Sequence, residues 1–351
     1  MKLLTVKKRK IAVLFTGGLG DTLLYTPLLK ELKKKQFVIT GIFYSKYDND
    51  CLLDESLVDK KVYCNTKIGL LLYSIFRLKH FTNTYINHLA FGKAIQLAAS
   101  ICSRKITKSA VDISTPTKKR IKNIVPGFSD AEENLYFLYS KENAAIKNIT
   151  SFHLPKPILD KELIKKYIDK DLSQSFILQI SAGNNTTPFK NWPIKNWLKL
   201  TETLCTHYPK INFIIVGDNT ETGYSNAFEN LPFKNCTTLI GKTTIPEIFN
   251  LVAFSNGYIG LDSGIMHIAT ALGKKTLTIF GASNEKLYGY EFLDAAAHKV
   301  ISTSISCRPC SSWKNANISR VTNPMLCPDF ACLTSIEPLF VFEQIVVHFN
   351  L

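Results

Sequence analysis

Three segments of this chain contain residue types that could carry out group transfer, and each follows a run of apolar residues. Asp21 lies in the glycine turn FTGGLGD, Lys190 ends the polar segment SAGNNTTPFK, and Asp262 and His267 lie in LDSGIMH. A carboxylate can act as a general base, whereas an ammonium group or the amides of a helix N-terminus can hold a phosphate. The sequence therefore offers a base in one half and anion-binding groups in the other.

The first segment resembles a dinucleotide-binding turn but departs from it. Gly18 and Gly20 match the first two glycines of G-x-G-x-x-G, whereas Leu23 takes the third position. Asp21 also places a negative charge where a pyrophosphate needs amides, which argues against a nicotinamide-dependent oxidoreductase. Asp21 can be a general base, or it can be only a helix cap, because an acid near a helix N-terminus stabilises the amides and the dipole.

The second segment places hydrogen-bond donors and one cation just beyond a strand. Thr186 and Thr187 precede Lys190, and Trp192 and Pro193 then open a helix. An ordinary hydrophilic loop would have the same composition. Lys190 favours the alternative, because its ammonium group is a point charge suited to a phosphate.

In the third segment, Asp262, Ser263 and Gly264 lie between a strand and a helix. The helix N-terminus offers amides and a favourable dipole to an anion, Gly264 permits close approach, and Ser263 adds a hydroxyl. His267 falls on the first turn. A histidine there is commonly a packed core residue or a hydrogen-bonding brace, but it could also meet a phosphate or an acid of the other domain.

The elements that position these residues alternate between strands and helices. In the second half, the strand-like runs are FILQIS (176–181), INFIIVG (211–217), GYIGL (257–261) and KTLTIFG (275–281). Helical patterns separate them, which predicts a parallel sheet with crossover helices. The first half begins with a strand-helix-strand unit, in which Pro27 should kink the helix over 21–34, and continues with the helical runs KIGLLLYSIF and GKAIQLAASICSR. We predict an α/β fold of two Rossmann-like, doubly wound domains facing a central cleft.

Length and composition narrow the class of protein. A chain of 351 residues favours two domains, which we place at 1–170 and 171–335, followed by a C-terminal helix over 336–351. No window is apolar enough for a membrane span, and the N-terminus lacks an export signal. The chain has nine cysteines, and this odd number suits a reducing compartment. We therefore expect a cytoplasmic protein. The net charge of +15, with basic clusters at 7–10, 33–35, 104–108 and 118–122, favours an anionic partner.

Taken in order, the segments resemble the bacterial heptosyltransferases of glycosyltransferase family 9. The resemblance lies in GGLGDTLLYTPLLKELK, SAGNNTTPFKNWPIKNW, YIGLDSGIMHIATALGKKTLTIFGAS and the tail CLTSIEPLFVFEQIV. It implies a GT-B architecture whose last helix returns to the first domain. It also implies inverting transfer of heptose from ADP-heptose to a lipid-linked saccharide of the lipopolysaccharide core, by a protein peripheral to the cytoplasmic face of the inner membrane. Nucleic acid is not an expected partner.

The resemblance also implies roles for individual residues. Asp21 would be the base, beside an acceptor-side turn that contains Gly18 and Gly20. The residues implied in binding the nucleotide and its diphosphate are Thr186, Thr187, Lys190, Asp262, Ser263, Gly264 and His267. Asp218 and Glu221 are both eligible to contact the ribose. We expect no metal cofactor for the reaction, because the lysine and the helix amides can stabilise the leaving group. A different nucleotide sugar, a capsule-type acceptor, or a non-catalytic binder of nucleotides or anionic glycans are the alternatives.

Four cysteines gather near the C-terminus, at Cys307, Cys310, Cys327 and Cys332. The first two form a C-x-x-C pair of the kind that zinc sites contain, whereas the second pair is more widely spaced. A structural zinc is possible on this spacing, but we favour reduced cysteines that brace a surface loop.

Overall fold

The computed structural model divides into two units, Met1–Lys156 (unit 1) and Pro157–Leu351 (unit 2). The structure describes residues 9–44, 49–86, 93–108, 152–158, 166, 168, 171–182, 187–218, 220, 222–291, 293–310 and 326–351. Contacts explain the division, which lies earlier than the expected boundary near residue 170. The amide of His153 donates to Thr26 Oγ1 in unit 1 at 3.1 Å, whereas the amide of Ile158 donates to Asn250 Oδ1 in unit 2 at 3.0 Å.

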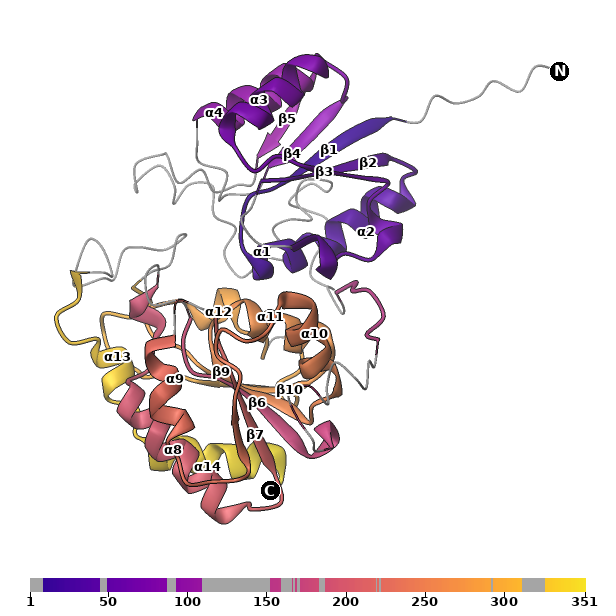
Figure 1. Ribbon diagram of the computed structural model, residues 1–351. Coiled ribbons are helices and arrows are strands. Elements are labelled where there is room, and N and C mark those ends of the chain that lie inside the picture. Colours follow the sequence, from indigo (N-terminus) through magenta and orange to yellow (C-terminus); the bar gives the residue numbers. More distant parts are fainter. Residues whose placement is uncertain are drawn as a thin grey trace. The chain divides into compact units, whose positions relative to one another are not determined.

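Unit 1 contains a parallel sheet of five strands in the order β3-β2-β1-β4-β5. Its strands are β1 (Lys10–Phe15), β2 (Val38–Phe43), β3 (Lys60–Tyr63), β4 (Asn83–Ile86) and β5 (Ile106–Lys108). Its helices are α1 (Leu19–Leu24), α2 (Thr26–Lys34), α3 (Lys67–Phe76) and α4 (Lys93–Cys102), with the short 3-10 helices η1 (Asn49–Leu52) and η2 (Glu55–Leu57). Helices α1 and α2 cover one face of the sheet, and α3 and α4 cover the other (Figure 1).

The kinked helix predicted over 21–34 consists of two helices that meet at Tyr25. Pro27 stands in the first turn of α2, where its missing amide breaks no helical hydrogen bond. The proline therefore starts a second helix rather than bending a single one. Leu28, Leu29 and Leu32 of α2 are fully buried, in agreement with their helical spacing.

Unit 2 contains a parallel sheet of six strands in the order β11-β10-β9-β6-β7-β8. Its strands are β6 (Ser175–Gln179), β7 (Asn212–Val216), β8 (Cys236–Thr238), β9 (Gly257–Leu261), β10 (Lys275–Ile279) and β11 (His298–Ile301). Its helices are α8 (Ile194–His207), α9 (Thr222–Glu229), α10 (Ile245–Phe254), α11 (Gly264–Ala271), α12 (Glu285–Tyr288), α13 (Ala331–Thr334) and α14 (Pro338–Phe349), with the 3-10 helices η5 (Leu172–Gln174) and η6 (Pro188–Lys190). The alternation predicted from the sequence is confirmed in this unit.

The terminal helix α14 packs on unit 2, which corrects the expectation that it returns to the first domain. Val341 and Ile345 are fully buried in the same core as Trp197 of α8. The ring of Phe349 contacts that of Phe176 in β6 edge to face, with centroids 4.8 Å apart. The apolar side of α14 is thus covered by α8 and the sheet, and this burial holds the helix on unit 2.

Within the described ranges, none of the helices has both the length and the apolar character needed to span a bilayer.

Candidate functional site

The loops after β6 and β9 adjoin each other in unit 2, because these two strands are neighbours in the sheet. The chain leaves β6 towards β7 on one side and later returns to β9 on the other side. In a parallel sheet, such a reversal opens a crevice beyond the carboxyl ends of the strands, where ligands bind. Lys190 follows β6 and Asp262 follows β9, so both predicted residues lie at this position.

Lys190 and Asp262 form an ion pair, with Nζ 2.8 Å from Oδ2. The Asp262 side chain is 3% exposed and that of Lys190 is 19% exposed. The hydroxyl of Ser283 donates to the same Oδ2 at 2.5 Å. Sequence reasoning did not identify Ser283, which lies after β10 in the segment GAS and carries no signal of its own beyond its place at a strand end.

The surroundings of Asp262 keep its carboxylate ionised. Burial alone would raise the pKa of this carboxyl, but the Lys190 ammonium, His267 and the hydrogen bond from Ser283 together hold the pKa below its ordinary value. A carboxylate of this kind can hold a lysine in place while the site contains no phosphate. The ammonium group can then interact with an anion that enters beside it.

Ser263 begins α11, but its hydroxyl is used elsewhere. It donates to Oε1 of Gln179 at the end of β6, and the buried Tyr258 hydroxyl donates to the same oxygen at 2.7 Å. Ser263 makes no side-chain cap of α11. The first amides of α11, starting at Gly264, therefore keep the anion-binding character expected of a helix N-terminus. Gln179 was missed by sequence reasoning, because its only signal is its place as a polar residue at the end of an apolar strand.

His267 lies on the first turn of α11 and is buried. Its Nδ1 is hydrogen-bonded to the hydroxyl of Tyr290, and the two rings meet edge to face with centroids 5.5 Å apart. This geometry supports the bracing role among those considered for this histidine. A contact between His267 and a phosphate stays a prediction.

Hydrogen bonds close the loop that carries Lys190. The Thr187 hydroxyl donates to the carbonyl of Ala182, and the Ala182 amide donates to Oδ1 of Asn191 at 2.7 Å. Trp192, next to Asn191, is buried and donates from Nε1 to the carbonyl of Ile336 at 3.0 Å. These contacts fix both ends of the loop. Thr186 lies outside the described residues.

The residues proposed for the ribose are only partly described. Asp218 follows β7 and is exposed, and its Oδ1 accepts hydrogen bonds from the amide and the hydroxyl of Thr220 at 2.7 and 2.5 Å. Glu221 lies outside the described residues. The choice between the two acids therefore stays open, with Asp218 already ordering its own loop.

In unit 1, Asp21 lies in the first turn of α1 and caps it. Its Oδ2 accepts the amide of Gly18 at 2.9 Å. The carboxylate also lies so close above Gly17 that a Cβ at that position would overlap it, which makes Gly17 a required glycine. Gly20 is buried inside α1. The capping role of Asp21 is thus observed, and the base role stays a prediction.

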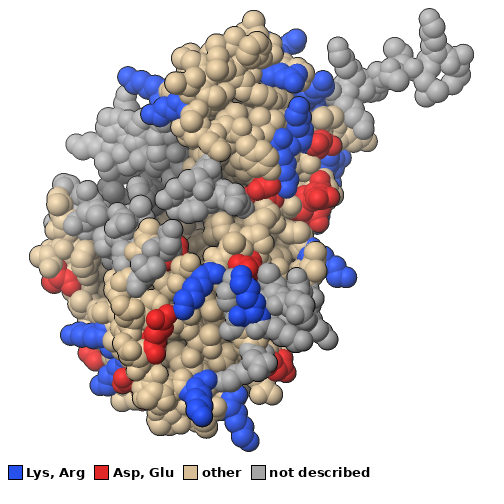
Figure 2. Space-filling model, viewed as in Figure 1, with Lys and Arg blue, Asp and Glu red and all other residues tan. Residues whose placement is uncertain are grey.

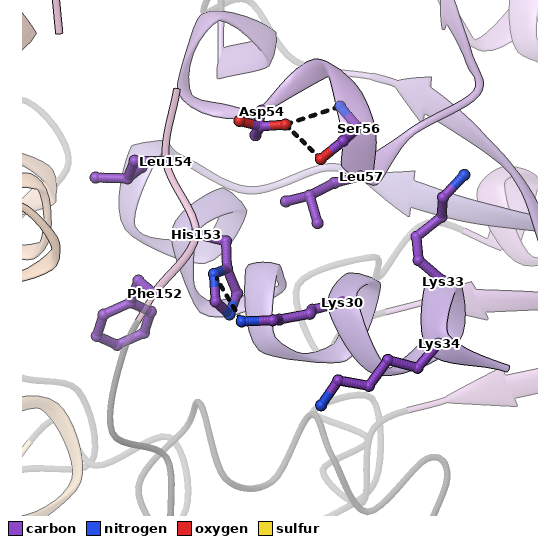
Figure 3. Close-up of a pocket in the computed structure, with 9 residues that line it drawn as sticks. All are labelled: Lys30, Lys33, Lys34, Asp54, Ser56, Leu57, Phe152, His153 and Leu154. Carbon is purple, nitrogen blue, oxygen red and sulfur yellow. Dashed lines mark hydrogen bonds between the residues drawn. The ribbon is translucent and has the colours of Figure 1, made fainter. Parts of the chain in front are cut away.

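Unit 1 also contains a pocket of about 430 Å³ between α2, η2 and the segment at 152–154 (Figure 3). Residues that line it are Lys30, Lys33, Lys34, Asp54, Ser56, Leu57, Phe152, His153 and Leu154. Lys33 and Lys34 are paired with Asp59 and Glu31, at 2.7 and 2.5 Å. Lys30 Nζ lies 3.4 Å from His153 Nδ1, and burial, together with Lys30 and Lys34, lowers the pKa of this histidine. The pocket therefore has less uncompensated charge than its three lysines suggest.

The four C-terminal cysteines are free thiols in this structure. Cys332 is buried, and burial raises its pKa to about 11, which keeps the thiol protonated. Across the described part of the chain, no group of three or more His, Cys, Asp or Glu side chains is arranged to hold a metal ion.

Comparison with known proteins connects this geometry to one family. Residues 155–318 match the family model of glycosyltransferase family 9 (heptosyltransferase). Lipooligosaccharide heptosyltransferase 2 of Campylobacter jejuni is 24% identical over 95% of this chain and 97% of its own length. Its namesake in Haemophilus influenzae is 26% identical, but that match spans only 37% of this chain and 38% of the relative.

A solved structure agrees in fold. The ADP-heptose LPS heptosyltransferase II of E. coli superposes with a TM-score of 0.67 at 16% identity, over 97% of this chain and 98% of that one. Together with the two parallel sheets, this likeness confirms the predicted fold class, an α/β chain with two Rossmann-like units of the GT-B type.

Proposed function

We propose that this chain is a glycosyltransferase of family 9, that its donor is ADP-heptose, and that its acceptor is a lipid-linked saccharide of the lipopolysaccharide core type. The names of its relatives support the sugar and the acceptor. The geometry of unit 2 supports the class of donor, because it gathers groups that favour a diphosphate.

The observation that carries this proposal is the Lys190–Asp262 pair at the switch between β6 and β9, next to the N-terminus of α11. A departing nucleoside diphosphate develops negative charge on its oxygen. An ammonium group and helix amides that are already in position stabilise that charge without reorganisation. Lys190 and the first turn of α11 therefore suit the leaving group.

The reaction that we propose is a single displacement with inversion. The acceptor hydroxyl oxygen forms a bond to the anomeric carbon of the sugar, while the bond from that carbon to the diphosphate oxygen breaks. Asp21 takes the proton of the hydroxyl, and ADP leaves with the bonding electron pair, stabilised by Lys190. Neither role requires a metal ion.

We place the protein at the cytoplasmic face of the inner membrane by peripheral contact. The support is the lipid-linked nature of the proposed acceptor and the net charge of +15, which favours anionic surfaces.

A capsule-type or other acceptor is the second candidate. The family match begins at residue 155 and leaves most of unit 1 outside it. The family match therefore covers the unit to which we assign donor binding, and it says least about the unit to which we assign acceptor binding.

The proposal is tested by incubating the full chain with ADP-heptose, UDP-glucose and GDP-mannose, each with delipidated core saccharide, and measuring release of the nucleoside diphosphate. We expect ADP release that depends on the saccharide. Release from another nucleotide sugar but not from ADP-heptose would overturn the donor. Release that a capsule-type saccharide stimulates, and the core saccharide does not, would favour the second candidate.

A further inference from the structure

Helix α3 of unit 1 exposes a continuous apolar face. Ile68, Leu72, Ile75 and Phe76 follow the spacing i, i+4, i+7 and i+8, which places them on one side of the helix. Ile68 is 72% exposed and Phe76 is 82% exposed, while Leu72 and Ile75 are each about half exposed. Leu78 continues the patch beyond the end of the helix at 69% exposure.

The opposite side of α3 already serves the core. Leu70 and Ser74 are buried, and Leu70 packs in the cluster that includes Ile95 of α4 and Leu14 of β1. The helix is thus apolar on both sides, although only one side has a partner. Single exposed apolar residues are ordinary, but a contiguous face of this kind marks an interaction surface.

Basic residues predominate in the segment that contains this face. Between Asp59 and Asp112 the sequence has no Asp or Glu, whereas residues 60–108 include nine Lys and Arg, of which Lys61 pairs with Asp50 at 3.3 Å. Lys67 and Arg77 stand at the two ends of α3, and neither has a carboxylate partner among the described residues. The surface over α3 and α4 in Figure 2 is mostly tan, with Lys and Arg side chains at its edges.

This charge pattern selects the kind of partner. A second copy of the chain, joined through the same face, would bring Lys67 and Arg77 of both copies together, and neither cation has a carboxylate partner among the described residues. An anionic bilayer complements both features, because apolar side chains enter the boundary of headgroups and acyl chains while Lys and Arg stay among the phosphates.

We propose that the exposed face of α3, with the neighbouring Leu97 of α4, is the surface by which this protein docks on an anionic lipid bilayer. Leu97 is 54% exposed, and α4 packs directly against α3. The inference deepens the proposed function, since docking brings the enzyme to a lipid-linked acceptor. The binding itself requires neither donor nor acceptor and can be measured without them.

The test is flotation of the full chain with vesicles of phosphatidylcholine mixed with phosphatidylglycerol, compared with vesicles of phosphatidylcholine alone. We expect binding to the anionic vesicles, release at about 1 M salt, and a loss of affinity of about tenfold or more in the double variant Ile68→Ser, Phe76→Ser. The matched control is Leu339→Ser, Val347→Ser on α14, whose side chains are 62% and 73% exposed. It should bind like the unchanged chain.

Three outcomes would overturn the docking surface. They are unchanged vesicle binding by the α3 variant, equal loss in the α14 control, and a change of oligomeric state in the α3 variant without lipid. ADP release with delipidated saccharide is measured on the same samples. If that activity is absent in every sample, the proposed function fails while the vesicle result still decides the surface.

Discussion

Replacing Lys190 with methionine should destabilise the protein as well as weaken donor binding. Asp262 is almost fully buried and has Lys190 as its cationic partner at 2.8 Å, so the substitution leaves an uncompensated carboxylate in the interior. Removing one partner of a buried pair costs about 3–5 kcal/mol. The hydrogen bond from Ser283 remains, and Lys190 is partly exposed, so we expect the lower end of that range, about 3 kcal/mol.

In a domain of this size, that loss corresponds to a fall of about 6–12 °C in the melting temperature. Lys242→Met is the matched control, because Lys242 pairs with Glu229 at 2.7 Å but both side chains are more than 40% exposed. Solvent screens an exposed pair, which therefore contributes little to stability, so this variant should melt within about 3 °C of the unchanged chain.

The pH dependence identifies the cause. In the unchanged protein the folded-state pKa of Asp262 lies below its ordinary value, so the pair stabilises the fold above the unfolded pKa and loses this contribution as pH falls. In Lys190→Met, burial acts without the ammonium group and raises the folded-state pKa. The stability gap between the two proteins should therefore narrow as pH is lowered from 7 to about 4, measured by denaturant unfolding.

A second substitution separates stability from binding. Lys190→Met combined with Asp262→Asn removes the buried charge and should recover stability to within about 1 kcal/mol. Its affinity for ADP, measured by calorimetry, should stay at least about tenfold weaker, because no cation remains for the diphosphate. A pH-independent gap, or full ADP affinity in the double variant, would refute the reasoning.

Three further substitutions probe the other contacts. Asp21→Asn keeps an oxygen for the Gly18 amide, so we expect an unchanged melting temperature. The amide cannot accept the acceptor's proton, so transfer activity should be lower by about two to four orders of magnitude. Near-normal transfer would show that Asp21 is only a cap. Gly17→Ala should displace the Asp21 carboxylate, which should abolish transfer while the affinity for ADP is retained. In the control Gly18→Ala the new Cβ would lie 3.9 Å from the same carboxylate, so transfer should fall far less. An equal fall in transfer in both variants would contradict this reasoning. Tyr258→Phe removes the hydroxyl whose single proton is shared by Gln179 Oε1 at 2.7 Å and the Leu261 carbonyl at 2.9 Å. Unfolding in denaturant should show a loss of about 1–2 kcal/mol, and no loss would show that this hydroxyl is dispensable.

Local patterns were enough to predict most of the elements. The run KIGLLLYSIF forms α3 with the expected bounds, and the apolar runs of the second half form parallel strands separated by helices. Periodicity and β-branched composition are local properties, which is why they can be read without the fold. The break at Tyr25 was missed, because Pro27 predicts an interruption but not whether it bends one helix or starts another.

The contacts that shape the site could not be predicted in the same way. Lys190 and Asp262 are 72 residues apart in sequence, and only the adjacency of β6 and β9 brings them together. Gln179 and Ser283 are polar residues at strand ends, a position too common to indicate a role. The position of α14 depended on which unit offered an apolar surface, and its own sequence does not encode that choice.

The pairing of Lys190 with Asp262 has a consequence for which anions the resting enzyme retains. A lone ammonium group in this crevice would attract inorganic phosphate, an abundant dianion in cells. With the carboxylate 2.8 Å away, the cation is already balanced, so a small anion gains little by displacing that contact. A nucleoside diphosphate, the proposed leaving group, would bring additional contacts through its base and ribose, and these would compensate for the disturbed pair. If the proposed function holds, the ion pair would discriminate against incomplete ligands, at the cost of part of the affinity for the complete one.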